Sequence, residues 1–351
     1  MNRLRSFDVL KGIACIAVVI IHYNFPGNLG YAVKSMSRFA VPIFFIISGY
    51  FLVSSKENGR ISASRIAHKL RHSAAILFVS SIFYSIFTLI FNNILNSSWS
   101  LEKYSSQTIT ATKILKLFIT NDPLVYAHLW YLLALIYCYL LMLFFEKKRI
   151  AYIGIWLAPI LLVSYASLQE FGAALHIKSS VQIAGADSLI YLYNLFIFRA
   201  LPFFLFGCCL HEWQTRVEQI QLPYFISIMI ILFGCILSIV ERFLFREAQF
   251  YIGTYISVFF MIVVAINVPI PRSKISTFFE YIGKNLSLYV YVLHIAVGKS
   301  MDLAANKLLI HRKPWYIYGR CLIILTISLI ISLFIHQVYL LGKERFCCYE
   351  K

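Results

Sequence analysis

Residues 5–25, RSFDVLKGIACIAVVIIHYNF, decide the fold class of this chain. From Val9 onward nearly every side chain belongs in hydrocarbon, and the run is long enough to cross a bilayer as a helix. Lys11 and His22 interrupt this run, although lipid disfavours both side chains. Ionisable residues inside membrane helices usually face water, a partner or one another, so we expect this helix to line a polar interior.

The rest of the chain has the same membrane character. Of its 351 residues, 60% are hydrophobic and only 13% are charged, which is more apolar surface than a soluble domain buries. The formal net charge of +17 is typical of basic loops kept on the cytoplasmic side, so we expect no nucleic-acid binding. The eight cysteines show neither a CxxC motif nor a ligand spacing with histidine. They are expected to pack in the core, and no metal site is expected.

Apolar stretches of spanning length predict an all-α integral membrane protein, a bundle of about ten transmembrane helices. A single membrane domain is expected over residues 1–351, with no appended soluble domain. The basic connection after the second span and an even number of helices predict that both termini are cytoplasmic. The expected spans are residues 7–25, 38–54, 73–94, 128–146, 150–168, 190–210, 222–241, 249–269, 279–298 and 316–341.

Lys11 and His22 are expected to share one face of the first helix. They are eleven residues apart, and at about 100° per residue they point the same way, separated by roughly 16 Å along the axis. Asp8 lies one turn before Lys11 and is its expected partner. The alternative is that Lys11 extends to the membrane interface and that His22 makes one hydrogen bond to a neighbouring helix. The shared face favours a common cavity.

A second group of polar residues lies in YIGKNLSLYVYVLHIAV at 281–297. Lys284, Ser287, Tyr291 and His294 are spaced by three, four and three residues, which puts them on one helical face. Tyr291 and His294 are therefore expected to point into the same interior as the first helix. The alternative is a hydrogen-bonded packing stripe.

Three further stretches carry candidate binding residues. His128, Trp130 and Tyr131 occur in HLWYLLAL, where an aromatic anchor at the membrane interface is the alternative. Arg199, in FIFRALPFFLFG, falls within an expected span and needs a partner or an anionic ligand. The stretch RIAHKLRH at 65–72 predicts a basic cytoplasmic face that suits phosphate groups, with an ordinary solvated loop as the alternative. The stretch ITATKILKLFIT at 109–120 predicts an amphipathic helix at the interface.

Taken together, these motifs resemble the membrane-bound acyltransferase family 3, which includes O-acetyltransferases of bacterial surface polysaccharides. The matching stretches are DVLKGIA at 8–14 with His22, FFIISGYFL at 44–52, HLWYL at 128–132, RALPFFLFG at 199–207 and GKNLSLYVYVLH at 283–294. They occur in order along most of the chain. The family often carries an arginine pair, RxxR, in the basic stretch; here the best-aligned positions are His68 and Arg71, so the first arginine is missing.

The resemblance implies transfer of an acyl group from acetyl-CoA to a hydroxyl of a surface polysaccharide or its lipid-linked precursor. It implies a multi-pass protein among the lipids of the bacterial inner (plasma) membrane. His22 is then the expected general base, and Lys11 is expected to act beside it and to bind the donor. Tyr291 or His294 is expected to donate to the thioester oxygen or to orient the acceptor.

The same resemblance suggests the binding residues. The expected acetyl-CoA ligands on the basic face are Arg65, His68, Lys69 and Arg71, and the expected acceptor ligands are His128, Trp130, Tyr131, Arg199 and Ser287. A transient acyl-histidine remains the alternative chemistry. A transporter or flippase of lipid-linked sugars remains the alternative function, although the expected spans hold few carboxylates for coupling to protons.

Overall fold

The computed structural model describes residues 5–53, 56–57, 60–95, 101–148, 156–164, 180–182, 189–191, 195–220, 223–245 and 248–349. They divide into two units: residues 1–44 together with 217–351, and residues 45–216. The boundary falls inside helix α3 (Ala40–Val53). Most of the described chain is helical. Two short antiparallel hairpins also occur in it, β1 (Lys56–Glu57) with β2 (Arg60–Ile61) and β3 (Ser180–Gln182) with β4 (Leu189–Tyr191).

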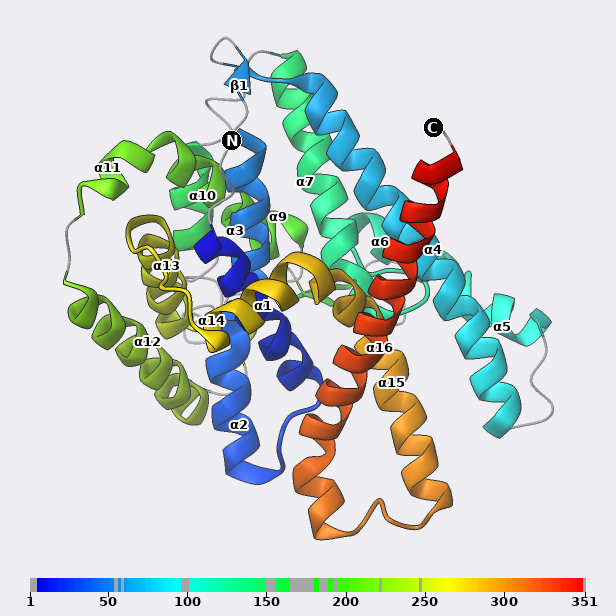
Figure 1. Cartoon of the computed structure of the whole chain (residues 1–351). Coiled ribbons are helices and arrows are strands. Elements are labelled where there is room, and N and C mark those ends of the chain that lie inside the picture. Colours follow the sequence, from blue (N-terminus) through cyan, green and yellow to red (C-terminus); the bar gives the residue numbers. More distant parts are fainter. Residues whose placement is uncertain are drawn as a thin grey trace. The chain divides into compact units, whose positions relative to one another are not determined.

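Helix α1 (Arg5–His22) is the centre of the first unit. It contacts α2, η1, α13, α14, η4, α15 and α16, because its surface is apolar on almost every side. Figure 1 shows α1 in dark blue among these helices. The other elements of the unit are α2 (Gly27–Met36), η1 (Ser37–Phe39), α12 (Tyr224–Phe245), α13 (Ile252–Asn267), α14 (Lys274–Tyr281), η4 (Ile282–Leu286), α15 (Ser287–Lys307) and α16 (Pro314–Tyr349).

The backbones of α1 and of the α14–η4 segment touch. A Cβ atom added to Gly12 would overlap the carbonyl oxygen of Phe279, and one added to Gly283 would overlap the carbonyl oxygen of Asp8. The start of α1 is tied to the same segment, because Arg5 Nε donates to Glu280 Oε2 at 2.6 Å. Glycine at both crossing points therefore sets how closely α1 approaches the helices that carry the candidate site.

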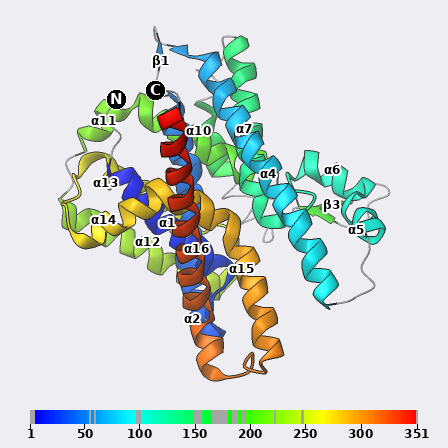
Figure 2. The same ribbon diagram turned by 45° about the vertical axis from the view of Figure 1, so that its right-hand side comes forward.

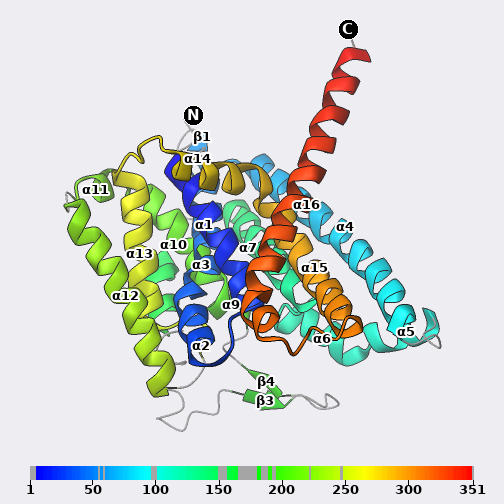
Figure 3. The same ribbon diagram turned by 60° about the horizontal axis from the view of Figure 1, so that its bottom comes forward.

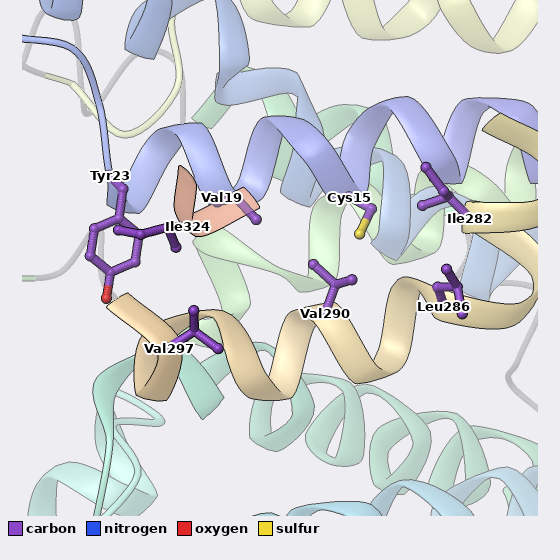
Figure 4. Close-up of a cluster of buried hydrophobic side chains, with 8 residues drawn as sticks. All are labelled: Cys15, Val19, Tyr23, Ile282, Leu286, Val290, Val297 and Ile324. Atoms are coloured by element: carbon purple, nitrogen blue, oxygen red, sulfur yellow. The ribbon is translucent and has the colours of Figure 1, made fainter. Parts of the chain in front are cut away.

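An apolar cluster joins α1 to α15 and α16 (Figure 4). Cys15, Val19 and Tyr23 project from the α1 segment toward Val290 and Val297 of α15 in that view. Its buried members are Cys15, Val19, Tyr23, Ile282, Leu286, Val290, Val297 and Ile324. Helices α15 and α16 form a hairpin beside it, visible in orange and red in Figure 2. The cluster fixes how the second half of α1 lies against α15.

Helices α12 and α13 form the other tight pair of this unit (Figure 3). Small residues let them approach, and Ser238 and Thr254 share a hydrogen bond at 3.3 Å. Glu241 accepts a hydrogen bond from the Gly253 backbone at the start of α13. The outer face of α12 is apolar and exposed, with Phe233 57% exposed, as expected of a helix that faces lipid.

The second unit is built around α7 (Trp130–Lys147), which packs along α4 (Ala63–Leu95). Helices α3 and α10 (Leu201–Glu212) cross closely here, because a Cβ atom on Gly49 would overlap Phe204 and one on Gly207 would overlap Ile46. Close backbone packing thus explains the SG motif of α3. The remaining elements are α5 (Leu101–Thr108), α6 (Ala111–Ile119), η2 (Ala127–Leu129), a helix at 156–164 and α9 (Phe196–Arg199).

The described residues confirm a helical protein with several apolar helices. Five of these helices are long and apolar enough to cross a membrane: Gly27–Val53, Ala63–Leu95, Ala127–Lys147, Tyr224–Phe245 and Pro314–Lys343. Helix Ile252–Asn267 is apolar but shorter. The number of ten spans and the cytoplasmic termini stay predictions, and most of the expected span 150–168 lies outside the described residues.

Three boundaries differ from the sequence prediction. Residues 27–37 form α2 and the start of η1, where we expected a connection. The expected span 190–210 is not one continuous helix, since the helix is interrupted at Ala200 between α9 and α10. The basic stretch 65–72 is the beginning of α4 and not a loop. The amphipathic segment was predicted correctly as a helix, which is α6, capped by Thr110.

Candidate active site

A pair of histidines forms the centre of the candidate site. His22 is the last residue of α1, and His294 lies two turns into α15. Their ring centroids are 5.1 Å apart, and the rings are tilted by 48°. His22 is exposed, whereas His294 is completely buried. One ring is therefore open to an incoming molecule, and the second lies next to it inside the protein.

The hydrogen bond of His294 defines its tautomer. Its Nδ1 atom lies 3.0 Å from the carbonyl oxygen of Val290. A carbonyl oxygen only accepts, so Nδ1 must carry the proton. In the neutral ring the lone pair is then on Nε2. His294 is suited to accept a proton at Nε2, and it can donate from that atom only as an imidazolium.

Two tyrosines flank the histidine pair. Tyr291, predicted from the helical spacing, lies 6.5 Å from His294 between ring centroids. Tyr23 lies at the same distance and meets the His294 ring edge-on, at 87°. The Tyr23 hydroxyl donates to the Ile295 carbonyl at 3.1 Å, and the Arg320 guanidinium lies 5.1 Å from its ring centroid. Sequence reasoning missed Tyr23, although its position directly after His22 was a signal.

Lys11 forms the expected ion pair. Its Nζ atom lies 2.6 Å from Asp8 Oδ1, and the side chains are 15% and 4% exposed. Lys11 and His22 lie on one face of a continuous helix, as the spacing predicted.

The second predicted constellation is only partly formed. Ser287, Tyr291 and His294 lie in one regular helix, α15. Lys284 lies in η4, a π-helical turn, and its side chain is exposed. The wider turn takes an extra residue, which shifts Lys284 off the α15 stripe. Ser287 donates its hydroxyl to the Gly283 carbonyl at 3.0 Å within this turn, so only its acceptor capacity is left for a ligand.

The second unit holds an arginine stacked on an aromatic ring. Arg199 is 9% exposed, and its Cζ atom lies 3.3 Å from the centroid of the Trp130 ring. Phe45 packs against Trp130 and Tyr131, with centroid distances of 5.9 and 4.7 Å. The Tyr131 and Ser48 hydroxyls are 3.5 Å apart. The cluster thus joins three motifs that are far apart in the sequence.

His128, two residues before Trp130 in the sequence, is also buried. It is 4% exposed and meets the Tyr84 ring of α4 edge-on, with centroids 4.8 Å apart. Tyr126 packs against both rings, with centroid distances of 4.3 Å to Tyr84 and 6.0 Å to His128. Tyr84 and Tyr126 were missed by sequence reasoning, because nothing in their local pattern separates them from ordinary core tyrosines.

Apart from Lys11 on α1, the predicted donor-binding residues lie on the first turns of α4. Arg65, His68, Lys69 and Arg71 are exposed there. The rings of His68 and His72 are stacked, with centroids 6.5 Å apart and planes within 7°. An exposed helical face with several cations suits phosphate groups. Among the described residues, no group of three or more histidine, cysteine or acidic side chains is arranged to hold a metal ion.

The fold is that of a helical membrane protein, and one of the two paired histidines belongs to its central helix, α1. A comparison with known protein families identifies the family. The family model described as an acyltransferase domain, acyltransferase family 3, matches residues 4–336. The chain belongs to this family, so it is a multi-pass membrane acyltransferase. No curated protein and no solved structure matches the chain.

Proposed function

We propose that this protein transfers an acetyl group from acetyl-CoA to a hydroxyl of a cell-surface polysaccharide or of its lipid-linked precursor. The observation that carries the proposal is the pair formed by the exposed His22 and the buried His294, at 5.1 Å. Acyl transfer to an alcohol needs a base for the hydroxyl proton, and a neutral imidazole within reach of substrate is the usual one.

In the proposed reaction the acceptor oxygen attacks the thioester carbonyl while His22 takes the hydroxyl proton. The carbon–sulfur bond then breaks, the acceptor keeps the acetyl group as an ester, and the proton passes from His22 to the CoA thiolate. Base catalysis of this kind contributes on the order of 10²–10⁴ in rate.

His294 supports His22 in this scheme. Its Nε2 lone pair, fixed by the hydrogen bond from Nδ1 to Val290, is suited to stabilise the imidazolium that forms at His22. The same geometry disfavours the role of neutral hydrogen-bond donor to the thioester oxygen. Tyr291, with its hydroxyl proton, is the better candidate for that donor.

The donor is proposed to bind through its phosphates and its pantetheine arm. The exposed cations Arg65, Lys69 and Arg71 on α4 suit the phosphates. On α1, Lys11 brings a positive charge held by Asp8, and the roughly 16 Å from Lys11 to His22 along the helix suits a long, slender arm.

The acceptor is proposed to use the stacked Arg199–Trp130 pair, with His128, Tyr131 and Ser287. A planar cation and an aromatic face together recognise polar rings by stacking and by directed hydrogen bonds. We further propose that the protein lies in the bacterial inner membrane with both termini in the cytoplasm, where acetyl-CoA is made available.

The test is incorporation of labelled acetyl from acetyl-CoA into membrane glycans. Wild type is compared at matched expression with His22→Ala and with His311→Ala, a control in the loop between α15 and α16. We expect an alkali-labile ester in wild type and in the control, but not in His22→Ala. Equal labelling in all three would show that His22 is structural. No labelling in any of them would remove the proposed activity.

A further inference from the structure

Positive charge is concentrated around His22. Lys34 lies in the last turn of α2 and Arg38 in η1, and both of these elements pack against α1, whose last residue is His22. Both charges act on the His22 ring. Both side chains are half-buried, and both belong to Gly27–Val53, a helix fit to cross a membrane. Cations within a membrane-spanning helix are costly and commonly mark the path of a ligand or ion.

Carboxylates are scarce around the same ring. Residues 22–44 contain no aspartate or glutamate, and residues 287–320 contain only Asp302. Asp302 pairs with Arg320, and Tyr316 donates to its Oδ1 atom at 3.2 Å. The one carboxylate of α15 is thus committed to α16. These two stretches of the chain therefore each carry a net positive charge.

We propose that the acceptor is anionic, and that Lys34 and Arg38 bind its carboxylate or phosphate group beside His22. This inference rests on the proposed acetyl transfer and narrows its substrate class. The charge belongs either to an acidic sugar of the glycan or to the diphosphate of a lipid carrier. Arginine and lysine bind both groups through charge-assisted hydrogen bonds.

An anionic acceptor also completes the chemistry of the base. Lys34 and Arg38 oppose the positive charge that His22 gains when it takes the hydroxyl proton. A bound anion neutralises their field, so the imidazolium forms more readily when the correct acceptor is present. A positive site also raises the local concentration of an anionic substrate. A neutral acceptor gains neither effect.

The experiment compares matched acceptors with purified protein in lipid nanodiscs. The probes are a uronic-acid oligosaccharide, its carboxyl-reduced neutral counterpart, and the neutral sugar linked to a polyprenyl diphosphate. Three variants are compared with wild type. They are the double variant Lys34→Gln/Arg38→Gln, the single variant Arg38→Lys, and a control double variant, Arg272→Gln/Lys274→Gln, which removes the same charge near the start of α14. Acetyl transfer and oligosaccharide binding are both measured.

We expect wild type and the control pair to prefer one anionic probe over the neutral one by at least about tenfold in kcat/KM. The Lys34–Arg38 double variant should lose this preference, and Arg38→Lys should keep most of it. Preference for the uronic-acid probe would identify a sugar carboxylate as the bound group, and preference for the polyprenyl-linked probe would identify the carrier diphosphate.

Equal use of all three probes by wild type would overturn the inference. A double variant in which the KM of acetyl-CoA rises while the KM of the acceptor is unchanged would also overturn it, because Lys34 and Arg38 would then bind the donor. If no probe is acetylated, the proposed function fails. Oligosaccharide binding then tests the anionic acceptor separately. Tighter binding of the charged probe than of the neutral one, lost in the Lys34–Arg38 double variant, would support it. Equal binding of charged and neutral probes would overturn it.

Discussion

The His294 imidazole donates through Nδ1 to the Val290 carbonyl, one helical turn away at 3.0 Å. This bond orients the ring and leaves Nε2 as an acceptor next to His22. The role of His294 is thus set by backbone geometry within its own helix, and it can be tested separately from that of His22.

Replacing His294 by glutamine should lower kcat sharply. The amide does not supply the basic Nε2, so we expect a fall on the order of 10²–10⁴, with little change in the KM of acetyl-CoA. Steady-state kinetics on purified protein provide the measurement. His336→Gln, in a ring cluster with Tyr281 and Tyr289, is the control. Unchanged kcat in the His294 variant would remove that residue from the mechanism.

Alanine at Gly283 should destabilise the protein. The added Cβ would overlap the Asp8 carbonyl oxygen and crowd the Gly12 nitrogen, and overpacking of this kind costs about 1–3 kcal/mol. Gly319→Ala is a matched control in α16, since its Cβ would meet only Ile323 Cδ1, at 3.7 Å. Thermal unfolding in detergent should show a lower Tm for the first variant alone. Equal Tm values would show that the crossing can relax.

Substituting lysine for Arg199 should impair acceptor use. Lysine keeps the charge but loses the planar stack on Trp130. We expect kcat/KM for the acceptor to fall about tenfold, with the KM of acetyl-CoA unchanged. Arg242→Lys is the control, because Arg242 also lies over a ring, that of Tyr31 at 4.6 Å. A loss confined to Tm would assign the Arg199 stack a purely structural role.

Arginine at position 68 should strengthen donor binding. It restores the RxxR spacing with Arg71 on the exposed face of α4, so we expect the KM of acetyl-CoA to fall several-fold, up to about tenfold. His72→Arg adds the same charge to the stacked neighbour one turn along the helix. If both variants lower the KM equally, added charge alone is responsible and the pair has no special role.

Direct transfer should leave no acyl-enzyme. With labelled acetyl-CoA and no acceptor, we expect no label on the denatured protein and no burst of CoA release. Label that is lost in His22→Ala would instead assign the acyl-histidine route. The measurement separates the two chemistries that the sequence left open.

Much of the candidate site was predictable because it depends on helical periodicity. The Lys11–Asp8 pair, the common face of Lys11 and His22, and the Tyr291–His294 pair all follow from spacing within one helix. Contacts between helices were harder to predict. The pairing of His22 with His294 was expected only as a shared interior, while the stack of Arg199 on Trp130 joins residues that no local pattern connects.

The errors in the fold also have physical causes. The segment PGNLGYAVKSM begins with residues typical of turns, so α2 was taken as a connection. Packing against α12 and η1 outweighs that local preference. The π-helical turn at Ile282–Leu286 was not predictable, because a single extra residue in a turn leaves the hydrophobic pattern almost unchanged.

The surroundings of Tyr23 have a consequence for the entropy of the reaction. Its hydroxyl is bound to Ile295, and a Cβ on Gly298 would overlap its ring. The backbone of the neighbouring His22 is therefore held in place, although its own ring is exposed. To reach an acceptor, His22 has to order only its two side-chain torsions, at a small fraction of the cost of ordering a loop. The chain has already lost that freedom on folding, so acceptor binding does not have to supply it.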